Sequence, residues 1–442
     1  MERLLLKKLK QWKESAYRKP LILRGARQVG KTWLLKEFGR QQYQSTAYFN
    51  FDEHAEYQQF FATTKDVKRI LMNLSMASGQ PIEPGKTLVI FDEIQECPAA
   101  LNTLKYFCEN LPELSVACAG SLLGIALTRP ASFPVGKVDF LSMGPMNFSE
   151  FLRALGDGNL TAYLETIDTI VPLPDAFFNP LAEKLKMYFV TGGMPEAVRL
   201  WTETHDTARV EQVLSNILLA YEQDFTKHAE PREYPKLSLI WHSLPSQLAR
   251  ENKKFLYKVV KRGARAREYE DALEWLCNAE LCTKVYRSSK PGLPMSAYDD
   301  LAAFKVYMLD VGLLRRLSLL LPSAFAEGNR LFVEFKGALT ENYILEALKT
   351  QFTAVPRYWT DPPYSEVDFL IQRDNDIFPI EVKADTNIKS RSLQKYKEKY
   401  GAAVKLRVRF SLQNLCLDDD ILNIPLFMAD QADRLIGMAM EK

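Results

Sequence analysis

The stretch Leu21–Thr32, LILRGARQVGKT, constrains the fold of this chain more than any other part of the sequence. A short apolar run, Leu21–Leu23, leads into Gly25, and after four further residues the chain reaches Gly30-Lys31-Thr32 and a stretch expected to be helical. The pattern G-x-x-x-x-G-K-[ST] binds phosphate when it lies between a buried strand and a helix, as it does here. The stretch therefore predicts a phosphate loop in a nucleotide-binding α/β domain.

Each residue type in this loop has a chemical reason. The glycines let successive backbone N–H groups point at phosphate oxygens, and the following helix adds partial positive charge at its N-terminus. Lys31 is expected to reach the β- and γ-phosphates, and the Thr32 hydroxyl to bind Mg²⁺. The residues expected to contact the nucleotide here are Gly25, Ala26, Arg27, Gln28, Val29, Gly30, Lys31, Thr32 and Trp33.

An acidic pair supplies the expected second half of the site. The apolar run Thr87–Phe91 is typical of a parallel strand covered on both faces, and it ends in Asp92-Glu93. Asp92 is expected to hold Mg²⁺ and Glu93 to polarise the attacking water. After a further apolar run, Ser121 is placed where it could touch the γ-phosphate, although a simple turn serine explains it nearly as well. Strands alternating with helices predict a parallel sheet with the ligand at the carboxyl ends of the strands.

Several motifs together resemble one family. GARQVGKT, FNFDE, VIFDEIQE, AGS and FVTGGMPEAV are similar to a prokaryotic branch of the AAA+-type ATPases, of the archaeal-ATPase or STAND-like kind. The resemblance implies an ATPase with ATP and Mg²⁺ as cofactors, and Lys31, Thr32, Asp92 and Glu93 match its motifs one by one. A kinase using the same loop would need an acceptor pocket that the sequence does not identify.

The resemblance also bears on two segments further along the chain. The segment SFPVGKV resembles a family stretch that often carries arginine where this chain has Lys137, so Arg129 and Arg24 are alternative arginine-finger candidates. In the family, the turn at Gly192-Gly193 belongs to a helical lid over the nucleotide. A plain interhelical turn is the competing interpretation.

Residues 231–330 favour a winged helix, because two amphipathic helical stretches are followed by two strand-like runs around a Pro-Gly turn. A positive helix start suits phosphate contacts on DNA, although a charge cluster is more often a solvated face. The basic residues concerned are Lys253, Lys254, Lys258, Lys261, Arg262, Arg265 and Arg267.

The last part of the chain carries a weaker motif. If residues 373–376 close a hairpin, Asp368 lies opposite Glu381 and shares a face with Lys383. Two carboxylates and a lysine can bind Mg²⁺ and orient water for phosphodiester cleavage. The arrangement resembles the D…E-x-K signature of restriction-endonuclease-like (PD-(D/E)XK) folds, with Glu341 matching the helix acid. Such domains can also survive as inactive scaffolds.

A basic segment comes after this motif and could track a nucleic-acid backbone or merely solvate a helix and a strand. Its members are Lys389, Arg391, Lys395, Lys397, Lys399, Lys405, Arg407 and Arg409.

Composition sets the outer limits. The 442 residues carry a formal net charge of only +2, so nucleic acid would have to bind at local patches. No signal-peptide pattern, long apolar span or zinc-type cysteine spacing is evident, which favours a cytoplasmic protein.

We expect four parts: an AAA+-like ATP-binding domain (1–145), a helical lid (146–230), a winged-helix region (231–330) and a nuclease-like α/β domain (331–442). ATP would be the ligand, with DNA, a protein partner or a second copy as further partners. The expected function is an ATPase whose nucleotide state controls DNA or partner binding. The alternative is a nucleotide-dependent protein-interaction switch with an inactive nuclease-like domain.

Overall fold

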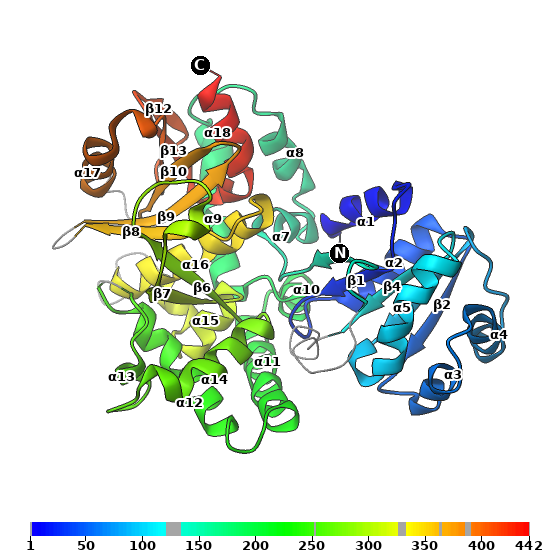
Figure 1. The fold of residues 1–442 in the computed structure, drawn as a ribbon. Coiled ribbons are helices and arrows are strands. Elements are labelled where there is room, and N and C mark those ends of the chain that lie inside the picture. The colour runs from blue at the N-terminus through cyan, green and yellow to red at the C-terminus, as the bar shows by residue number, and fades with distance from the viewer. Residues whose placement is uncertain are drawn as a thin grey trace. The chain divides into compact units, whose positions relative to one another are not determined.

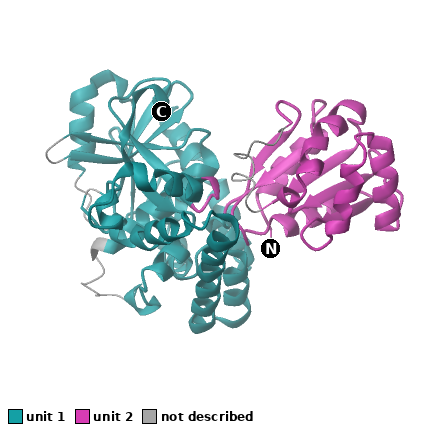
Figure 2. Ribbon diagram, turned by 60° about the horizontal axis from the view of Figure 1, so that its bottom comes forward, with its two compact units in different colours: residues 1, 145–277, 282–442 teal, residues 2–144, 278–281 magenta. Residues whose placement is uncertain are grey.

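The computed structural model describes residues 2–120, 134–251, 253–325, 333–361, 365–384 and 390–441. Two compact units are present, one made of residues 2–144 with 278–281, the other of residues 145–277 with 282–442 (Figure 2). Each unit is described by itself below. The division into four parts that the sequence favours stays a prediction.

The unit that contains residues 2–144 is built on one parallel sheet of five strands in the order β2-β3-β4-β1-β5 (Figure 1). This confirms the predicted α/β fold. Its strands are β1 (Leu21–Arg24), β2 (Ser45–Asn50), β3 (Thr87–Asp92), β4 (Ser115–Ala119) and β5 (Asp139–Ser142). Its helices are α1 (Leu5–Glu14), α2 (Lys31–Gln42), η1 (Ala55–Gln58), α3 (Gln59–Ala62), α4 (Val67–Ser78), η2 (Ile94–Glu96) and α5 (Pro98–Asn110).

Strands β1, β3 and β4 are buried along almost their whole length, as expected for parallel strands with helices on both faces. Aromatic side chains dominate one side of the core, where Phe91 packs against Phe51 and Phe61 with ring centroids 5.6 Å apart. This packing fixes the carboxyl end of β3, where the predicted acidic pair lies.

The second unit contains an eight-stranded sheet in the order β12-β13-β11-β10-β9-β8-β6-β7 (Figure 1). The hairpin expected of the winged helix, β6 and β7, joins this sheet through a pairing of Arg287 with Tyr358. The strands are β6 (Cys282–Ser288), β7 (Asp299–Met308), β8 (Arg357–Asp361), β9 (Ser365–Arg373), β10 (Asp376–Val382), β11 (Arg407–Ser411), β12 (Cys416–Asp418) and β13 (Ile421–Pro425). The segments expected to form the wing and the nuclease-like sheet thus share one sheet.

Helices make up the rest of this unit. Its α-helices are α7 (Phe148–Ala154), α8 (Gly158–Thr166), α9 (Asp175–Thr191), α10 (Pro195–Thr204), α11 (Thr207–His228), α12 (Tyr234–Leu248), α13 (Tyr257–Val260), α14 (Ala266–Asn278), α15 (Val311–Leu317), α16 (Val333–Gln351), α17 (Arg391–Tyr400) and α18 (Ala432–Met440). Across the described part of the chain, no helix combines the length and apolarity that crossing a bilayer requires.

The turn between α9 and α10 is held by close backbone packing. A Cβ on Gly193 would lie 2.0 Å from the carbonyl oxygen of Met146, and Met146 N–H donates to the Gly193 carbonyl at 2.7 Å. The buried Asp310 carboxylate accepts from Gly193 N–H at 2.6 Å and caps α15 by accepting from Leu313 N–H at 2.8 Å. These contacts fix the turn within its unit, and its expected place in a helical lid stays a prediction.

Strands β9 and β10 form the predicted hairpin, but its loop is shorter than expected. Arg373 pairs with Asp376, so only Asp374 and Asn375 lie between the strands, with Asp374 at φ +52°. The predicted pairing of residues 372 and 377 is present, and the ladder continues to the pair of Phe369 with Ile380. One further step in the same register places Asp368 opposite Glu381.

Candidate functional site

The phosphate loop has the backbone conformation that its sequence requires. Gly25, Gln28 and Gly30 have positive φ angles of +149°, +67° and +98°. A Cβ on Gly25 would lie 2.2 Å from the carbonyl oxygen of Met143, so only glycine fits there. The loop runs from the end of β1 into α2, which begins at Lys31.

Lys31 lies inside this loop. Its side chain is 7 % exposed, and its ammonium donates to the carbonyl oxygens of Gly25 at 2.8 Å and Ala26 at 2.7 Å. Burial lowers the pKa of Lys31 to about 8, although the nearby carboxylates of Glu93 and Asp92 act in the opposite direction. Phosphate oxygens could replace the two carbonyl oxygens as acceptors.

Thr32 and Asp92, the two residues expected to bind Mg²⁺, are in contact with each other. The Thr32 hydroxyl donates to Asp92 Oδ2 at 2.7 Å, across the gap between α2 and β3. Asp92 is buried, and its other oxygen, Oδ1, accepts from the Glu93 N–H at 3.1 Å. A hydroxyl and a carboxylate are oxygen ligands of the kind that Mg²⁺ prefers, so the residues present fit this ion.

Tyr48 is a member of the site that sequence reasoning missed. Its hydroxyl also donates to Asp92 Oδ2, at 2.8 Å, and its ring lies 3.6 Å from the Lys36 ammonium. Burial, followed by the hydrogen bond to Asp92, raises the pKa of Tyr48, so its hydroxyl is a donor at neutral pH. The in-register pairing of β2 with β3 brings Tyr48 here, and a single aromatic residue in a strand gives no signal of this.

Glu93 comes directly after the end of β3. It adopts a left-handed backbone conformation with φ +49°, and its Oε2 accepts from Gln95 Nε2 at 2.6 Å. The half-buried carboxylate therefore has a fixed orientation beside Asp92, as a group that polarises water requires.

A second missed residue, Arg3, supports the loop backbone. Its guanidinium donates to the carbonyl oxygens of Val29 at 2.8 Å and Gly144 at 2.7 Å, and the side chain is 6 % exposed. Arg3 precedes α1, and a single arginine before a helix gives no sequence signal of these contacts. Trp33, in contrast, is 45 % exposed on α2, where it directly follows Thr32.

The structure describes only some of the remaining residues that were predicted for this site. Ser121 and Arg129 lie outside the described residues. Lys137 forms a surface ion pair with Glu109 at 2.9 Å, and the Arg24 guanidinium stacks 3.9 Å from the centre of the Phe140 ring. An arginine finger is therefore not identified among these side chains.

The predicted C-terminal carboxylates lie on strands β9 and β10 of the eight-stranded sheet and on helix α16. Glu341 of α16 is 4 % exposed and accepts from the Tyr307 hydroxyl at 3.0 Å and from Lys253. Asp368 of β9 accepts from Val382 N–H at 2.8 Å, which ties the two strands of the hairpin together. Glu381 of β10 pairs with Lys383 at 2.9 Å.

Charges in this cluster interact strongly. Burial opposes ionisation of Glu341, but Lys253 and Lys305 outweigh it and hold the pKa of Glu341 below its usual value. Burial, with the Glu341 charge second, raises the pKa of Asp368 to about 8. Within the described ranges, no group of three or more His, Cys, Asp or Glu side chains is arranged to hold a metal ion.

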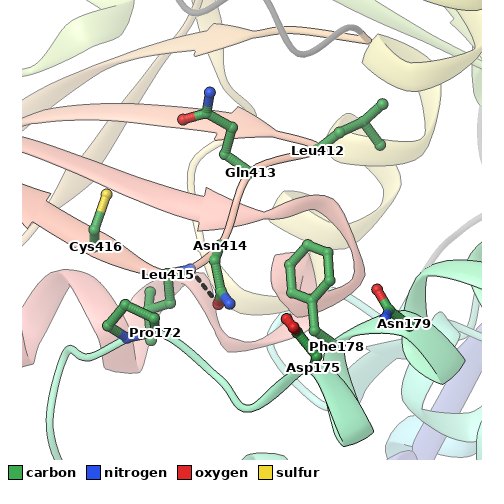
Figure 3. A pocket seen from close by; sticks show the side chains of 9 residues that line it. All are labelled: Pro172, Asp175, Phe178, Asn179, Leu412, Gln413, Asn414, Leu415 and Cys416. Carbon is green, nitrogen blue, oxygen red and sulfur yellow. Dashed lines mark hydrogen bonds between the residues drawn. The ribbon is translucent and has the colours of Figure 1, made fainter.

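A separate hollow of about 460 Å³ lies in the second unit (Figure 3). Asn414 lies at its edge, and the Oδ1 atom of Asn414 accepts hydrogen bonds from Leu173 N–H and Leu415 N–H, each at 2.8 Å. None of the predicted site residues lines it. Its lining is Pro172, Asp175, Phe178, Asn179, Leu412, Gln413, Asn414, Leu415 and Cys416.

Comparisons with known proteins match a domain in the part of the chain that carries the phosphate loop, and they leave the function of the C-terminal part open. Residues 17–152 match a family model described as an AAA domain. Residues 182–324 and 336–427 match two models described as domains of unknown function, DUF8612 and DUF4143. No curated protein matches the chain significantly.

Solved structures give weaker likenesses. The Walker-type ATPase PABY2304 of Pyrococcus abyssi is 15% identical, with a TM-score of 0.43 over 71% of this chain and 94% of that one. The Aeropyrum pernix Orc1 protein, solved in complex with DNA, is 14% identical, with a TM-score of 0.28 over 71% and 90%.

DnaA from Aquifex aeolicus, bound to AMPPCP, is also 14% identical, with a TM-score of 0.27 over 62% of this chain and 78% of that one. TM-scores this low do not establish a shared overall fold, so the domain assignment rests on the family match and on the geometry of the site. Residues 17–152 match the AAA domain model, and within that range the structure has a phosphate loop on a five-stranded parallel sheet, as a P-loop nucleotide-binding fold requires.

Proposed function

We propose that this protein is a Mg²⁺-dependent ATPase whose active site lies between the phosphate loop and the end of β3. The observation that carries the proposal is the hydrogen bond of 2.7 Å between Thr32 and Asp92, because it brings two Mg²⁺-type ligands together beside Lys31. Mg²⁺, when bound, neutralises charge on the phosphate oxygens. Thr32 and Asp92 would hold it.

The chain's own residues would divide the remaining work. Lys31 would exchange its bonds to the Gly25 and Ala26 carbonyls for bonds to the β- and γ-phosphate oxygens. Glu93 would take the proton of the water that attacks the γ-phosphorus, while the bond to the β–γ bridging oxygen breaks and ADP leaves. Burial makes each of these charge interactions stronger than it would be in water.

Phosphate release from Mg·ATP tests this proposal. The variants Lys31→Ala and Glu93→Gln should each lose most of the turnover, the second while keeping nucleotide binding. Glu113→Gln is a matched control, since Glu113 is exposed and plays no part in the site. Wild-type turnover retained in Glu93→Gln would remove Glu93 from the mechanism.

We further propose that the nucleotide state controls DNA binding through basic side chains before and at the start of α14. The five are exposed, and the cations at the start of α14, Arg265 and Arg267, oppose its helix dipole, so the stability of α14 does not account for those two. Acidic residues such as Glu268 accompany them on α14. The five basic residues are Lys258, Lys261, Arg262, Arg265 and Arg267.

Binding of a labelled duplex over a range of salt concentrations tests this contact. The triple variant Lys261→Ser, Arg262→Ser, Arg265→Ser should bind more weakly, and its salt slope should fall by about 0.9 per lost phosphate contact. The triple variant Lys65→Ser, Lys68→Ser, Arg69→Ser is a matched control, because it removes the same charge from exposed positions outside every candidate DNA surface. Equal affinity and slope in the triple variant and wild type would exclude this surface.

The coupling itself has its own test. If nucleotide state controls DNA affinity, adding ATP should change the wild-type affinity and leave that of Lys31→Ala unchanged. An identical response of both proteins to ATP would contradict the coupling without touching the ATPase proposal.

The alternative, a protein-interaction switch, is favoured by the basic residues that come after the hairpin. Lys397 pairs with Asp420 at 2.6 Å, and Lys399 with Asp361 at 2.6 Å, so these cations are already engaged within the chain. Gel filtration with and without ATP would detect self-assembly. A DNA response with no change in assembly favours the first proposal.

A further inference from the structure

The carboxylates of the nuclease-like motif lie among lysines that the motif does not contain. Both oxygens of Glu341 are engaged: Oε1 pairs with Lys253, while Oε2 accepts from the Tyr307 hydroxyl at 3.0 Å and lies 3.8 Å from Lys305 Nζ. Glu341 is 4 % exposed. Lys253, Lys305 and Tyr307 precede the motif by many residues and reach it only in the folded chain.

Lys305 is the centre of this arrangement. It is fully buried on β7 and forms a second ion pair with Glu366 of β9, so one ammonium lies between two carboxylates. Burying an ammonium is costly unless partners compensate it. Lys253 reaches Glu341 from a left-handed backbone conformation with φ +47°, which a lysine adopts only when its surroundings hold it there.

The other two acids are also engaged. Asp368 Oδ2 accepts from Val382 N–H at 2.8 Å, and Glu381 Oε1 pairs with Lys383 at 2.9 Å. One buried oxygen, Glu381 Oε2, has no hydrogen-bond partner among the described residues. A divalent cation needs several oxygen ligands, and here it would also face the two ammonium groups that already neutralise Glu341 and Glu366.

We propose that Lys253 and Lys305 take the place of the divalent cation in this cluster, so that the C-terminal domain binds no metal at Glu341, Asp368 and Glu381 and cleaves no phosphodiester. The cluster instead fastens β7 and the segment around residue 253 to α16. This inference is independent of the ATPase proposal, because the two sites share no residue.

Mn²⁺ binding to the full-length protein, followed by electron paramagnetic resonance without nucleotide, tests the inference together with nicking of supercoiled plasmid in Mn²⁺. Wild type and Glu381→Gln should give the same Mn²⁺ titration and no nicking. Mn²⁺ binding or nicking that wild type shows and Glu381→Gln lacks would overturn the inference. ATP turnover, measured on the same samples, reports separately on the phosphate loop.

The role of the two lysines can be tested by a gain of Mn²⁺ binding when they are replaced. The variant Lys253→Met, Lys305→Met should acquire a Mn²⁺ site that a further Asp368→Asn change removes. A folded double variant that acquires no such site would overturn the claim that the lysines replace the cation.

Should the double variant fail to fold, Lys253→Met alone leaves the fully buried Lys305 in place. Its urea unfolding midpoint should fall, and the added change Glu341→Gln should restore much of the loss because it removes the carboxylate charge that Lys253 no longer balances. Additive losses in this pair would contradict the proposed fastening role.

Discussion

The hydroxyl of Tyr48 gives the sharpest prediction about the phosphate-loop site. Tyr48→Phe removes one hydrogen bond of 2.8 Å to Asp92 Oδ2 and keeps the ring that contacts Lys36. A hydrogen bond to a charged group contributes about 1.5–3 kcal/mol, or roughly tenfold to a hundredfold in an equilibrium constant. Losing an outer partner of a metal-binding carboxylate costs about 10–100-fold in metal affinity, which is the same range.

Because Tyr48 is only partly buried, we expect the lower end of that range. The apparent Mg²⁺ affinity in ATP turnover should weaken about tenfold, while turnover at saturating Mg²⁺ changes little. A Mg²⁺ titration at fixed ATP measures both quantities. Tyr57→Phe is the matched control, since Tyr57 lies on η1 and makes ring contacts with Phe49. An unchanged Mg²⁺ dependence in Tyr48→Phe would refute the assignment of Tyr48 as a positioning residue.

Single contacts elsewhere in the chain give three more predictions. Gly193→Ala should lower the urea unfolding free energy of its unit by about 3–5 kcal/mol, because its Cβ would displace Met146 and disturb three buried hydrogen bonds. The control is Gly337→Ala on α16, where the added Cβ meets open space, and this change should be neutral or slightly stabilising. Arg3→Met should weaken nucleotide binding in a fluorescent-ATP titration by loosening the loop, and unaltered affinity would argue against this supporting role. Burial raises the pKa of Asp310 from 3.8 to about 6, so the folded state holds the extra proton between those values. Stability from this group is therefore highest in acid, and wild type should lose about 2.4 kcal/mol relative to Asp310→Asn between pH 4 and pH 7 in urea unfolding.

The phosphate-loop domain could be predicted from the sequence because the patterns that indicate it are local. The apolar runs at Leu21–Leu23, Thr87–Phe91 and Ser115–Ala119 each become a buried strand. Parallel strands end at one edge of a sheet, so Thr32 and Asp92 could be placed together without coordinates.

Functional residues that come from distant parts of the chain could not be predicted from the sequence. Tyr48 reaches Asp92 only through the pairing of β2 with β3, and Arg3 reaches the loop from before the first helix. In the C-terminal cluster, Lys253 and Lys305 come from segments whose sequence pattern indicated a winged helix and gave no sign of carboxylate partners. A buried ion pair between separate elements leaves no periodic pattern in the sequence from which it could be predicted.

The hairpin of β9 and β10 shows an intermediate case. The loop has two residues and not four, yet the predicted pairing of 372 with 377 is correct, because shortening the loop extends both strands by one residue. Symmetric extension preserves register, so Asp368 and Glu381 keep their expected relation although the turn differs.

The central claim is that Lys31, Thr32 and Asp92 form a Mg·ATP site. Isothermal titration of Mg·ATP into the full-length protein tests it most directly, with Lys31→Ala as the comparison. The account predicts saturable binding at one site in wild type and a loss of that binding in the variant. Folded wild-type protein that binds no Mg·ATP, or a Lys31→Ala variant that binds as well as wild type, would contradict it.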